Sequence, residues 1–413
     1  MKPNKNHQSR GRARALSTAI FATSLLGATV ISASASASAS ASASAKDTGL
    51  LETSMPLEES GITPHATLLA EVYNNHSGGI SNGSAFASLL DVGVELDLEK
   101  LAGWEGASIF ANAFYFKGDD ITGERIGDFN AVTNLYTDTS FNFYNIFFQQ
   151  SFGNGDSFFK LGQIALDDDF MVSESALLFI NAGFGPLPVQ SGNTAAPIYA
   201  LAAAGGVLHY DIEGPGFFQA GVYAGDSGAA ESGNKGFGWK TGGAAGWMVM
   251  AEAGFSYGED DASVVKVGGY YHTGDYQRFA DGQTESGIYS MYAIIDHQLI
   301  APNGSPSLNV FFRGGITPKG EIAVVSAYAE AGLVSKNIFK EDDALGLSTS
   351  WTDLSDDFRL AEGGSSSETV MELTYQLPVN DYLAIQPDVQ YIINPQGGGD
   401  NALVTGIRAE ITF

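Results

Sequence analysis

The chain closes with Leu403-Val404-Thr405-Gly406-Ile407-Arg408-Ala409-Glu410-Ile411-Thr412-Phe413, a stretch in which apolar and polar side chains alternate. In an extended strand, successive side chains point to opposite faces. One face would then carry Leu403, Ile407, Ala409, Ile411 and Phe413, and the other would carry Arg408, Glu410 and Thr412. A last strand with one apolar face, one charged face and a terminal aromatic residue is typical of outer-membrane barrels. We therefore predict that lipid meets one face and that water inside a pore meets the other.

Segments of about ten residues, the length that a tilted strand needs to cross a bilayer, recur before this stretch. Sixteen strands are predicted, an even number as in bacterial single-chain barrels. They cover residues 66–75, 85–97, 106–116, 139–152, 156–165, 205–212, 215–225, 247–257, 262–273, 287–299, 306–316, 321–334, 344–353, 367–378, 381–393 and 401–413. After residue 45 the sequence has no apolar run of the ~18 residues that a membrane helix requires.

The lengths of the connections support the same fold. Tight-turn sequences at 153–156, 213–216, 258–261 and 379–381 follow even-numbered strands. Long connections at 117–138, 166–204, 226–246, 274–286 and 354–366 follow odd-numbered strands. This asymmetry predicts short periplasmic turns, long extracellular loops and two periplasmic termini. Two connections depart from it, because 317–320 is short and 335–343 is long.

The predicted fold class is therefore all-β, a transmembrane antiparallel β-barrel of about 16 strands. A soluble β-sandwich is the alternative. Its strands also alternate, but sandwiches do not usually repeat the pattern this often with such a difference between their two ends.

The N-terminal residues have the features of an export signal. A basic segment with five Lys and Arg residues precedes an apolar stretch at 15–31 and a Ser-Ala tract that ends at residue 45. We predict a signal peptide with this low-complexity tract at 1–45, a periplasmic lead-in at 46–65 and the barrel at 66–413. An uncleaved inner-membrane anchor is the alternative, although the apolar stretch is short for a span.

Alternation also assigns the faces of individual strands. In 381–393, Leu383, Ile385, Val389 and Tyr391 are predicted to face lipid, and Pro387 is predicted to mark a bulge because it cannot donate a ladder hydrogen bond. In 321–334 the predicted lipid-facing residues are Ala323, Val325, Ala327 and Ala329. The interfacial aromatic girdle is predicted to include Trp104, Phe141, Phe143, Phe147, Phe148, Phe158 and Phe159. For some of these residues, a position along the sugar path is the alternative.

The charge balance is strongly acidic. The chain of 413 residues has a formal net charge of −27, no Cys and 51 Gly. Cleavage after residue 45 would remove five basic and no acidic residues, and so would leave a net charge of −32. Nucleic acid is a poor partner for such a surface. An aqueous lumen with this balance would favour cations or neutral solutes over anions.

Three blocks of sequence resemble a known family. The first is 96–107, LDLEKLAGWEGA. The second is Lys160-Leu161-Gly162-Gln163, followed by Asp169-Phe170 and Phe179-Ile180-Asn181. The third and most specific contains Glu372-Leu373-Thr374-Tyr375 and the stretch 385–395, IQPDVQYIINP. These blocks are similar to those of carbohydrate-selective porins of the OprB type. Over about 66–413, the resemblance implies a sixteen-stranded barrel that lets small sugars cross the outer membrane passively.

Candidate residues of the solute path follow from the alternation and from the long loops. Acids outnumber bases among the inward positions, and charges of both signs would hydrogen-bond neutral polyols. The candidates are Lys160, Arg125, Asp128, Glu252, Lys266, Arg313, Glu372, Asp388, Arg408, Trp239 and Trp247. For each inward residue, a solvated wall position without selectivity is the alternative.

The long connection 166–204 is the best candidate for a loop folded into the pore, because 39 residues exceed a mere connection. A cap over the outer rim is the alternative. Residues 171–182 are predicted to form a short helix that ends at Gly185-Pro186-Leu187-Pro188. The triad Asp167-Asp168-Asp169 has hard oxygen donors suited to Ca²⁺, but its spacing fits an exposed acidic cluster better.

The leading functional hypothesis is an outer-membrane porin for passive diffusion of small neutral sugars, with no cofactor and no bound metal. A general cation-preferring porin is the first alternative, and a barrel enzyme that acts on lipid is the second. The sequence has no Gly-x-Ser-x-Gly, no His-Glu-x-x-His and no phosphate-binding loop. The predicted partners are outer-membrane lipid and lipopolysaccharide, and a homotrimer is a candidate assembly.

Overall fold

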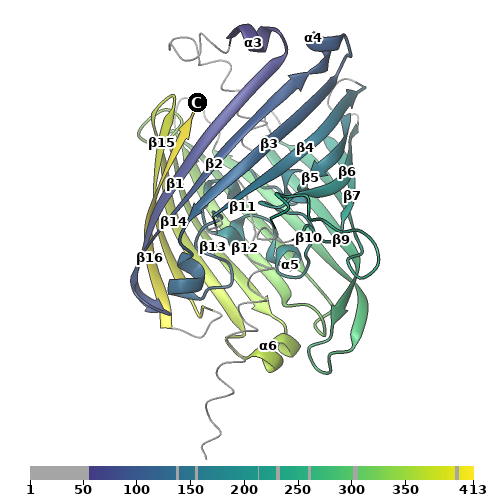
Figure 1. Ribbon diagram of the computed structural model, residues 1–413. Coiled ribbons are helices and arrows are strands. Elements are labelled where there is room, and N and C mark those ends of the chain that lie inside the picture. Colours follow the sequence, from purple (N-terminus) through teal and green to yellow (C-terminus); the bar gives the residue numbers. More distant parts are fainter. Residues whose placement is uncertain are drawn as a thin grey trace, which may run out of the picture.

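The described residues form a closed barrel of sixteen antiparallel strands (Figure 1). The computed structural model describes residues 55–135, 139–153, 157–212, 214–228, 233–258, 262–300, 306–395 and 400–413. The strands are β1 (Ile62–Gly79), β2 (Gly83–Asp97), β3 (Ala107–Gly118), β4 (Ser140–Phe152), β5 (Ser157–Ile164), β6 (Ala203–Ile212), β7 (Gly216–Ala224), β8 (Trp247–Tyr257), β9 (Ser263–Gln277), β10 (Thr284–Ile300), β11 (Ser307–Ile316), β12 (Val325–Lys336), β13 (Ala344–Leu354), β14 (Ser367–Asn380), β15 (Leu383–Ile393) and β16 (Asp400–Thr412). The predicted signal peptide and the first part of the lead-in lie outside the described residues.

Helical segments are short, and all but α3, which precedes β1, lie in the connections between strands. They are α3 (Met55–Glu59), α4 (Leu98–Ala102), η2 (Thr122–Ile126), η3 (Leu166–Asp168), η4 (Ala176–Leu178), η5 (Ala182–Phe184), α5 (Pro188–Ser191) and α6 (Asp356–Glu362). Within the described residues, every helix is too short to span a membrane.

The closing strand has the two faces that its sequence predicts. β1 and β16 pair in register, with Leu68 opposite Ile411 and Glu71 opposite Arg408. Arg408 is 6% exposed and Ile407 is 48% exposed, so the charged face points inward and the apolar face outward. Because β1 completes the ladder of β16, the barrel has no free edge between its ends.

All sixteen predicted strands are present, and the errors lie at the rims. β1 begins at Ile62, four residues before its predicted start at 66. β9 and β10 continue pairing as far as Gln277 and Thr284, so the predicted connection 274–286 is reduced to 278–283. Beyond the lipid boundary the outer face no longer needs apolar residues. The alternation therefore ends before the ladder does.

Two face assignments are wrong. Ala323 lies before β12, and both Ala323 and Val325 are buried inside the barrel instead of facing lipid. An irregularity in the β12–β13 register between Val325 and Ala327 shifts the phase of the alternation there. Side-chain hydrogen bonds fix the position, because Asn193 donates to the Val325 carbonyl (2.8 Å) and accepts from its amide (2.8 Å).

The prediction of a bulge at Pro387 is also wrong. The β15–β16 register runs evenly through Pro387, which lies opposite Ile407. The β14–β15 register is the same on both sides of it, with Thr374 opposite Asp388 and Leu377 opposite Ile385. A ladder can therefore tolerate a missing N–H without inserting a residue.

A bulge in β4 divides the predicted aromatic girdle. Tyr144 and Asn145 both lie opposite Asn112, and both are buried. The bulge reverses the phase of the strand, so Phe143 faces outward and Phe147 faces inward. Phe148 and Phe159 pack together on the outward face, where Phe148 also contacts Trp104. Phe147 and Phe158 instead contact Lys160 inside the barrel, so these two do not belong to an outer girdle.

The two rims differ as predicted. The C-terminus lies at the rim that carries α3 and α4, and α6 lies at the opposite rim (Figure 1). The connections at the α4 rim are mostly tight, such as the two residues between β14 and β15, whereas the β5–β6 connection spans 165–202 at the other rim. We call these the short-turn rim and the long-loop rim, and we call residues 165–202 the pore loop.

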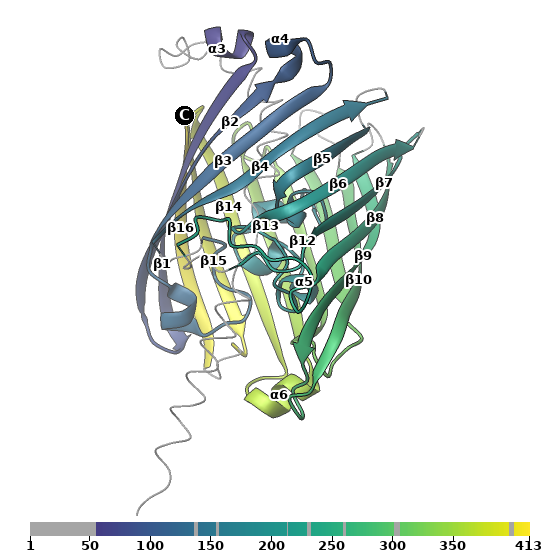
Figure 2. The ribbon, with the colours of Figure 1, turned by 45° about the vertical axis from the view of Figure 1, so that its right-hand side comes forward.

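The pore loop folds into the barrel, where α5 is seen between the walls in Figures 1 and 2. Its apolar residues make a core with the inward wall: Leu166, Phe170, Met171, Leu187 and Val189 pack with Tyr223, Met248, Met250, Tyr270 and Tyr292. The alternative of a cap over the rim is therefore wrong.

The helix predicted at 171–182 is also wrong. This part of the loop is irregular, with single 3₁₀ turns at η4 and η5, and α5 begins at Pro188, where the helix was predicted to have ended. Carboxylates of the wall accept hydrogen bonds from the backbone amides of Met171, Ile180 and Asn181. Those amides are thus unavailable for a helical ladder. Proline fits the first position of α5 because its missing N–H would have had no helical partner there.

Candidate pore constriction

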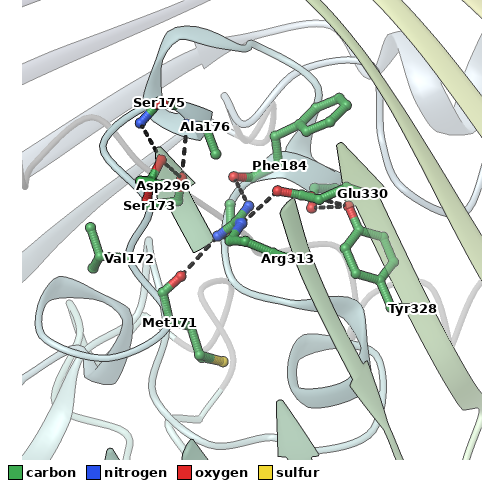
Figure 3. A network of polar contacts seen from close by, with 12 residues as sticks. Met171, Val172, Ser173, Ser175, Ala176, Phe184, Asp296, Arg313, Tyr328 and Glu330 are labelled. Carbon is green, nitrogen blue, oxygen red and sulfur yellow. Dashed lines mark hydrogen bonds and ion pairs between the residues drawn. The ribbon is translucent and has the colours of Figure 1, made fainter. Parts of the chain in front are cut away.

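Arg313 holds the two ends of one pore-loop segment together (Figure 3). It lies on the inward face of β11 and is buried. Its guanidinium donates to the carbonyls of Met171 (2.9 Å), Gly185 (2.8 Å) and Phe184, and its Nε donates to Glu330 on β12 (2.5 Å). A planar guanidinium has five donors in fixed directions, and three of these bonds fix residues 171–185 against the wall.

Tyr328 completes this anchor. Its hydroxyl lies between the carbonyl of Gly183 (2.7 Å) and the carboxylate of Glu330. The Arg313–Glu330 ion pair is thus surrounded by hydrogen-bond partners, which offsets the cost of removing two charges from water. The pair is more than a wall charge, because it sets the position of the loop.

Three further carboxylates of the wall bind the pore loop. Glu252 on β8 accepts from the Met171 amide (3.1 Å), and Asp296 on β10 accepts from the Ser173 hydroxyl (2.8 Å) and the Ser175 amide (3.3 Å). Glu372 on β14 accepts from the amides of Ile180 (2.6 Å) and Asn181 (3.0 Å). These are charge-assisted bonds, which are stronger than bonds between neutral groups.

The β3–β4 loop, which begins after Gly118, is held in the same way. Glu368 accepts from the amides of Phe129 (2.6 Å) and Asn130 (2.9 Å). Glu71 accepts from the Thr133 hydroxyl (2.6 Å) and pairs with Arg408, which also donates to Asn134 (2.7 Å). Two loops therefore cover the middle of the inner wall.

The beginning of the pore loop contains the Asp triad, and the prediction that this cluster is exposed is wrong. Asp167 accepts from the Tyr199 amide (3.1 Å), Asp168 from Asn145 (2.6 Å) and the Tyr144 hydroxyl (3.2 Å), and Asp169 from Lys160 (2.6 Å). Burial raises the pKa of Asp168 to about 6, and the charge of Asp169 adds to this effect. Burial also raises the pKa of Asp167 well above its usual value.

Most of the predicted path residues are covered by the loops. Glu252, Arg313, Glu372, Asp388 and Arg408 all face inward, as predicted, but all are buried. A solute in the lumen cannot reach a side chain in that position. Glu252, Arg313 and Glu372 bond the pore loop, and Arg408 bonds Asn134 of the β3–β4 loop. Asp388 instead accepts from Gln390 on its own strand.

Two lysines on the short-turn side of the pore loop are partly exposed. Lys160 on β5 bonds Asp169, and Lys266 on β9 donates to the carbonyl of Val172 (3.0 Å). Both are partly exposed and lie on the inward face. They are the two predicted path residues on the wall that remain within reach of a passing solute.

The other four candidates lie in or beside the long loops. Arg125 is held at the β1–β2 turn, where its carbonyl accepts from the amides of Ile80 (2.8 Å) and Ser81 (2.9 Å). Asp128 is buried, and burial together with the charge of Glu368 raises its pKa well above the usual value. Trp239 is exposed in the β7–β8 loop, and Trp247 lies on the outward face of β8, which does not suit contact with a solute in the lumen.

Several inward residues of importance were not predicted. Glu368 is in phase with Glu372 on β14, so the alternation already contained the signal for it. Phe110 and Phe217 also face inward, but an aromatic residue in a barrel strand is usually assigned to the lipid face. Only their pairing across strands with inward residues identifies them.

Comparison with known proteins supports the fold and the class. The model of the carbohydrate-selective porin, OprB family matches residues 81–413. The chain is 25% identical to Porin B of Pseudomonas aeruginosa over 99% of its own length and 100% of that protein. The high-pH structure of Pseudomonas putida OprB superposes with a TM-score of 0.78 at 21% identity, and covers 87% of this chain and 96% of that one. The low-pH structure gives 0.58 at 17% identity, with coverage of 87% and 95%.

Proposed function

Because the chain belongs to the carbohydrate-selective porin, OprB family and is an outer-membrane channel for sugars, we propose that its pore loop decides which solutes pass. The observation that carries this proposal is the set of buried wall residues that hold the loop across the barrel. Arg313, Glu252 and Glu372 come from three different strands and all bond the loop backbone. A segment anchored on several sides can set a fixed aperture.

The same anchoring argues for neutral solutes. The inward acids and bases would give a lumen of strong charge if all were free. Instead Glu71, Glu330 and Asp169 are each paired with a cation, and Glu252, Glu368 and Glu372 accept backbone or amide hydrogens. Most of these carboxylates therefore bind the loops or a neighbouring cation and are not free to attract a solute. This favours a polyol-conducting channel over a general cation-preferring porin.

The assignments of the chain ends and of the surroundings are part of the proposal. Residues 1–45 would serve as the export signal, and the short-turn rim would face the periplasm. Exposed apolar side chains such as Val72, Leu208 and Leu347 on the outward face suit contact with outer-membrane lipid. We propose no catalytic turnover, and the homotrimer remains a prediction.

Liposome swelling tests the proposal most directly. Purified protein in liposomes should admit glucose and other small saccharides faster than size-matched neutral solutes that are not sugars. In planar bilayers, a sugar should reduce ionic conductance at saturating concentration. Equal swelling rates for sugars and for matched non-sugars would contradict selectivity. Turnover of a labelled phospholipid would contradict the absence of catalysis.

A further inference from the structure

A row of aromatic rings lines one side of the inner wall, on the short-turn side of the pore loop. Stacked rings follow one another around the wall, on neighbouring strands in three pairs and across β2 in the first pair. His65 lies 5.5 Å from Phe110, Phe110 lies 5.4 Å from Phe147, Phe158 lies 5.0 Å from His209, and His209 lies 5.1 Å from Phe217. We call these six residues the aromatic track.

Lys160 joins the two halves of the track. Its Nζ lies 5.3 Å from the centre of the Phe147 ring and 5.2 Å from the centre of the Phe158 ring. Lys266 lies 5.8 Å from the Phe217 ring at the far end. All three contacts are within the range of a cation–π interaction. The rings and the two lysines therefore form one series of contacts with members on β1, β3, β4, β5, β6, β7 and β9.

The track faces the lumen. Phe158 and Lys160 are two residues apart on β5 and so share a face, and Lys160 bonds Asp169 of the pore loop inside the barrel. Phe110 is directly opposite Phe147, and Phe158 is directly opposite His209. All six residues are partly exposed, and the exposed part of each inward side chain meets the lumen.

The wall next to the track, beyond β1, is different at its short-turn end. Its partly exposed inward residues include Gln376 on β14 and Glu410 on β16, and β16 pairs with β1. The inner surface of a water-filled barrel is normally polar, and an exposed apolar strip usually marks a binding surface. An aromatic strip with polar side chains beside it suits a ligand that has an apolar face and a polar rim.

Carbohydrates have this form, because their ring C–H groups make an apolar face and their hydroxyls make a polar edge. Resting on the proposed function, we propose that the aromatic track is a weak carbohydrate-binding surface along which sugars move between the pore loop and the short-turn rim. Lys160 and Asp211, which is partly exposed next to His209, lie where sugar hydroxyls can bond them. Weak binding at successive rings permits both capture and release.

Three single variants test the proposal. Phe110→Leu and Phe158→Leu keep an apolar side chain and remove a ring from the track. Phe148→Leu is the matched control, because it removes a ring from the outward face of β4. For each variant, block of the ionic current by glucose and by maltotriose is titrated in planar bilayers. Conductance without sugar reports whether the pore is intact.

We expect the half-blocking sugar concentration to rise about fivefold to tenfold for Phe110→Leu and Phe158→Leu, which corresponds to ~1–1.4 kcal/mol of lost stacking. Conductance without sugar and the Phe148→Leu titration should be unchanged. Unchanged block in both track variants, or an equal rise in Phe148→Leu, would overturn the track alone. Absence of any sugar effect in the unaltered protein would overturn the proposed function and the track with it.

Discussion

The inner wall of the barrel has two levels that differ in what they contact. At the middle level, Arg313, Glu330 and Glu372 are buried beneath the pore loop and bond its backbone. Nearer the short-turn rim, Phe158 and His209 are partly exposed to the lumen. Both levels obey the same inward alternation. Pointing inward is therefore necessary for contact with a solute but not sufficient, because a loop can occupy the wall first.

The largest expected effect comes from Arg313→Ala at the middle level. The variant loses three bonds to loop carbonyls and leaves Glu330 buried without its cation, a change that costs about 3–5 kcal/mol when a buried pair is broken. The pore loop should be released, so single-channel conductance should rise severalfold and larger saccharides should enter liposomes.

A double variant separates the effect of losing the loop bonds from the effect of leaving Glu330 buried without a cation. Arg313→Leu with Glu330→Leu removes the charge pair without leaving one charge unpaired, so the barrel should regain stability in thermal unfolding while conductance stays high. Arg359→Ala, on the exposed α6, is the control for loss of an arginine. Normal conductance in Arg313→Ala would show that the loop is held by other contacts.

A smaller effect is expected from Glu372→Gln. The side chain keeps its shape and one oxygen, but the bonds to the amides of Ile180 and Asn181 lose their charge assistance. Bonds to a charged group are worth about 1.5–3 kcal/mol, and neutral ones less. We expect more frequent current fluctuations in single-channel recordings with the mean conductance nearly unchanged. Recordings as quiet as those of the unaltered protein would argue against this anchor.

The pH response of the pore loop is the next effect in size. The pKa of Asp168 is raised by burial to about 6 in the folded protein, from an ordinary 3.8. An acid with a raised pKa holds its proton more tightly when folded. Its stabilising contribution is thus complete below about pH 4 and is lost as pH rises to about 6.

Amide hydrogen exchange of residues 165–202 measures this response. After correction for the intrinsic rate, exchange should be severalfold faster at pH 7 than at pH 5. Asp168→Asn mimics the protonated carboxyl and should remove the difference. A pH dependence that persists in Asp168→Asn would assign the response to another group.

The smallest effect is expected on the outward face. Trp247 alternates with the buried Met248 on β8 and is 44% exposed on the outer surface. Trp247→Leu should leave sugar block and conductance within about twofold of the unaltered protein, since a lipid-facing position tolerates apolar residues. A large loss of sugar block in this variant would mean that the outward face contacts the solute.

The sequence predicts the barrel well because the lipid imposes alternation on every strand. On β16, for example, Ile407 is exposed on the outward face and Arg408 is buried on the inward face, as the alternation predicts. The alternation of apolar and polar side chains fails to predict the faces where a bulge or a loop, and not lipid or water, determines the contacts. The β4 bulge at Tyr144 and Asn145 reverses the phase of Phe147, and a single inserted residue leaves no periodic signal.

The candidate site is predicted less well, for a related reason. Alternation identifies Glu252, Arg313 and Glu372 as inward, but it carries no information about a loop that returns from another part of the chain. Residues 171–182 have the composition of a helix, yet their amides are bonded by carboxylates about 80 to 190 residues away in sequence. Tertiary contacts of this kind override local propensity.

The inner wall divides into a loop-covered level and an accessible level, and thiol labelling tests this division directly. The protein has no Cys, so one introduced Cys is the only reactive thiol. In membranes, a small water-soluble thiol reagent should label His209→Cys quickly. It should label Val370→Cys, an inward residue buried beneath the loops, and the outward Phe148→Cys at least tenfold more slowly, since both are removed from lumenal water. Labelling of Val370→Cys as fast as that of His209→Cys would contradict the account.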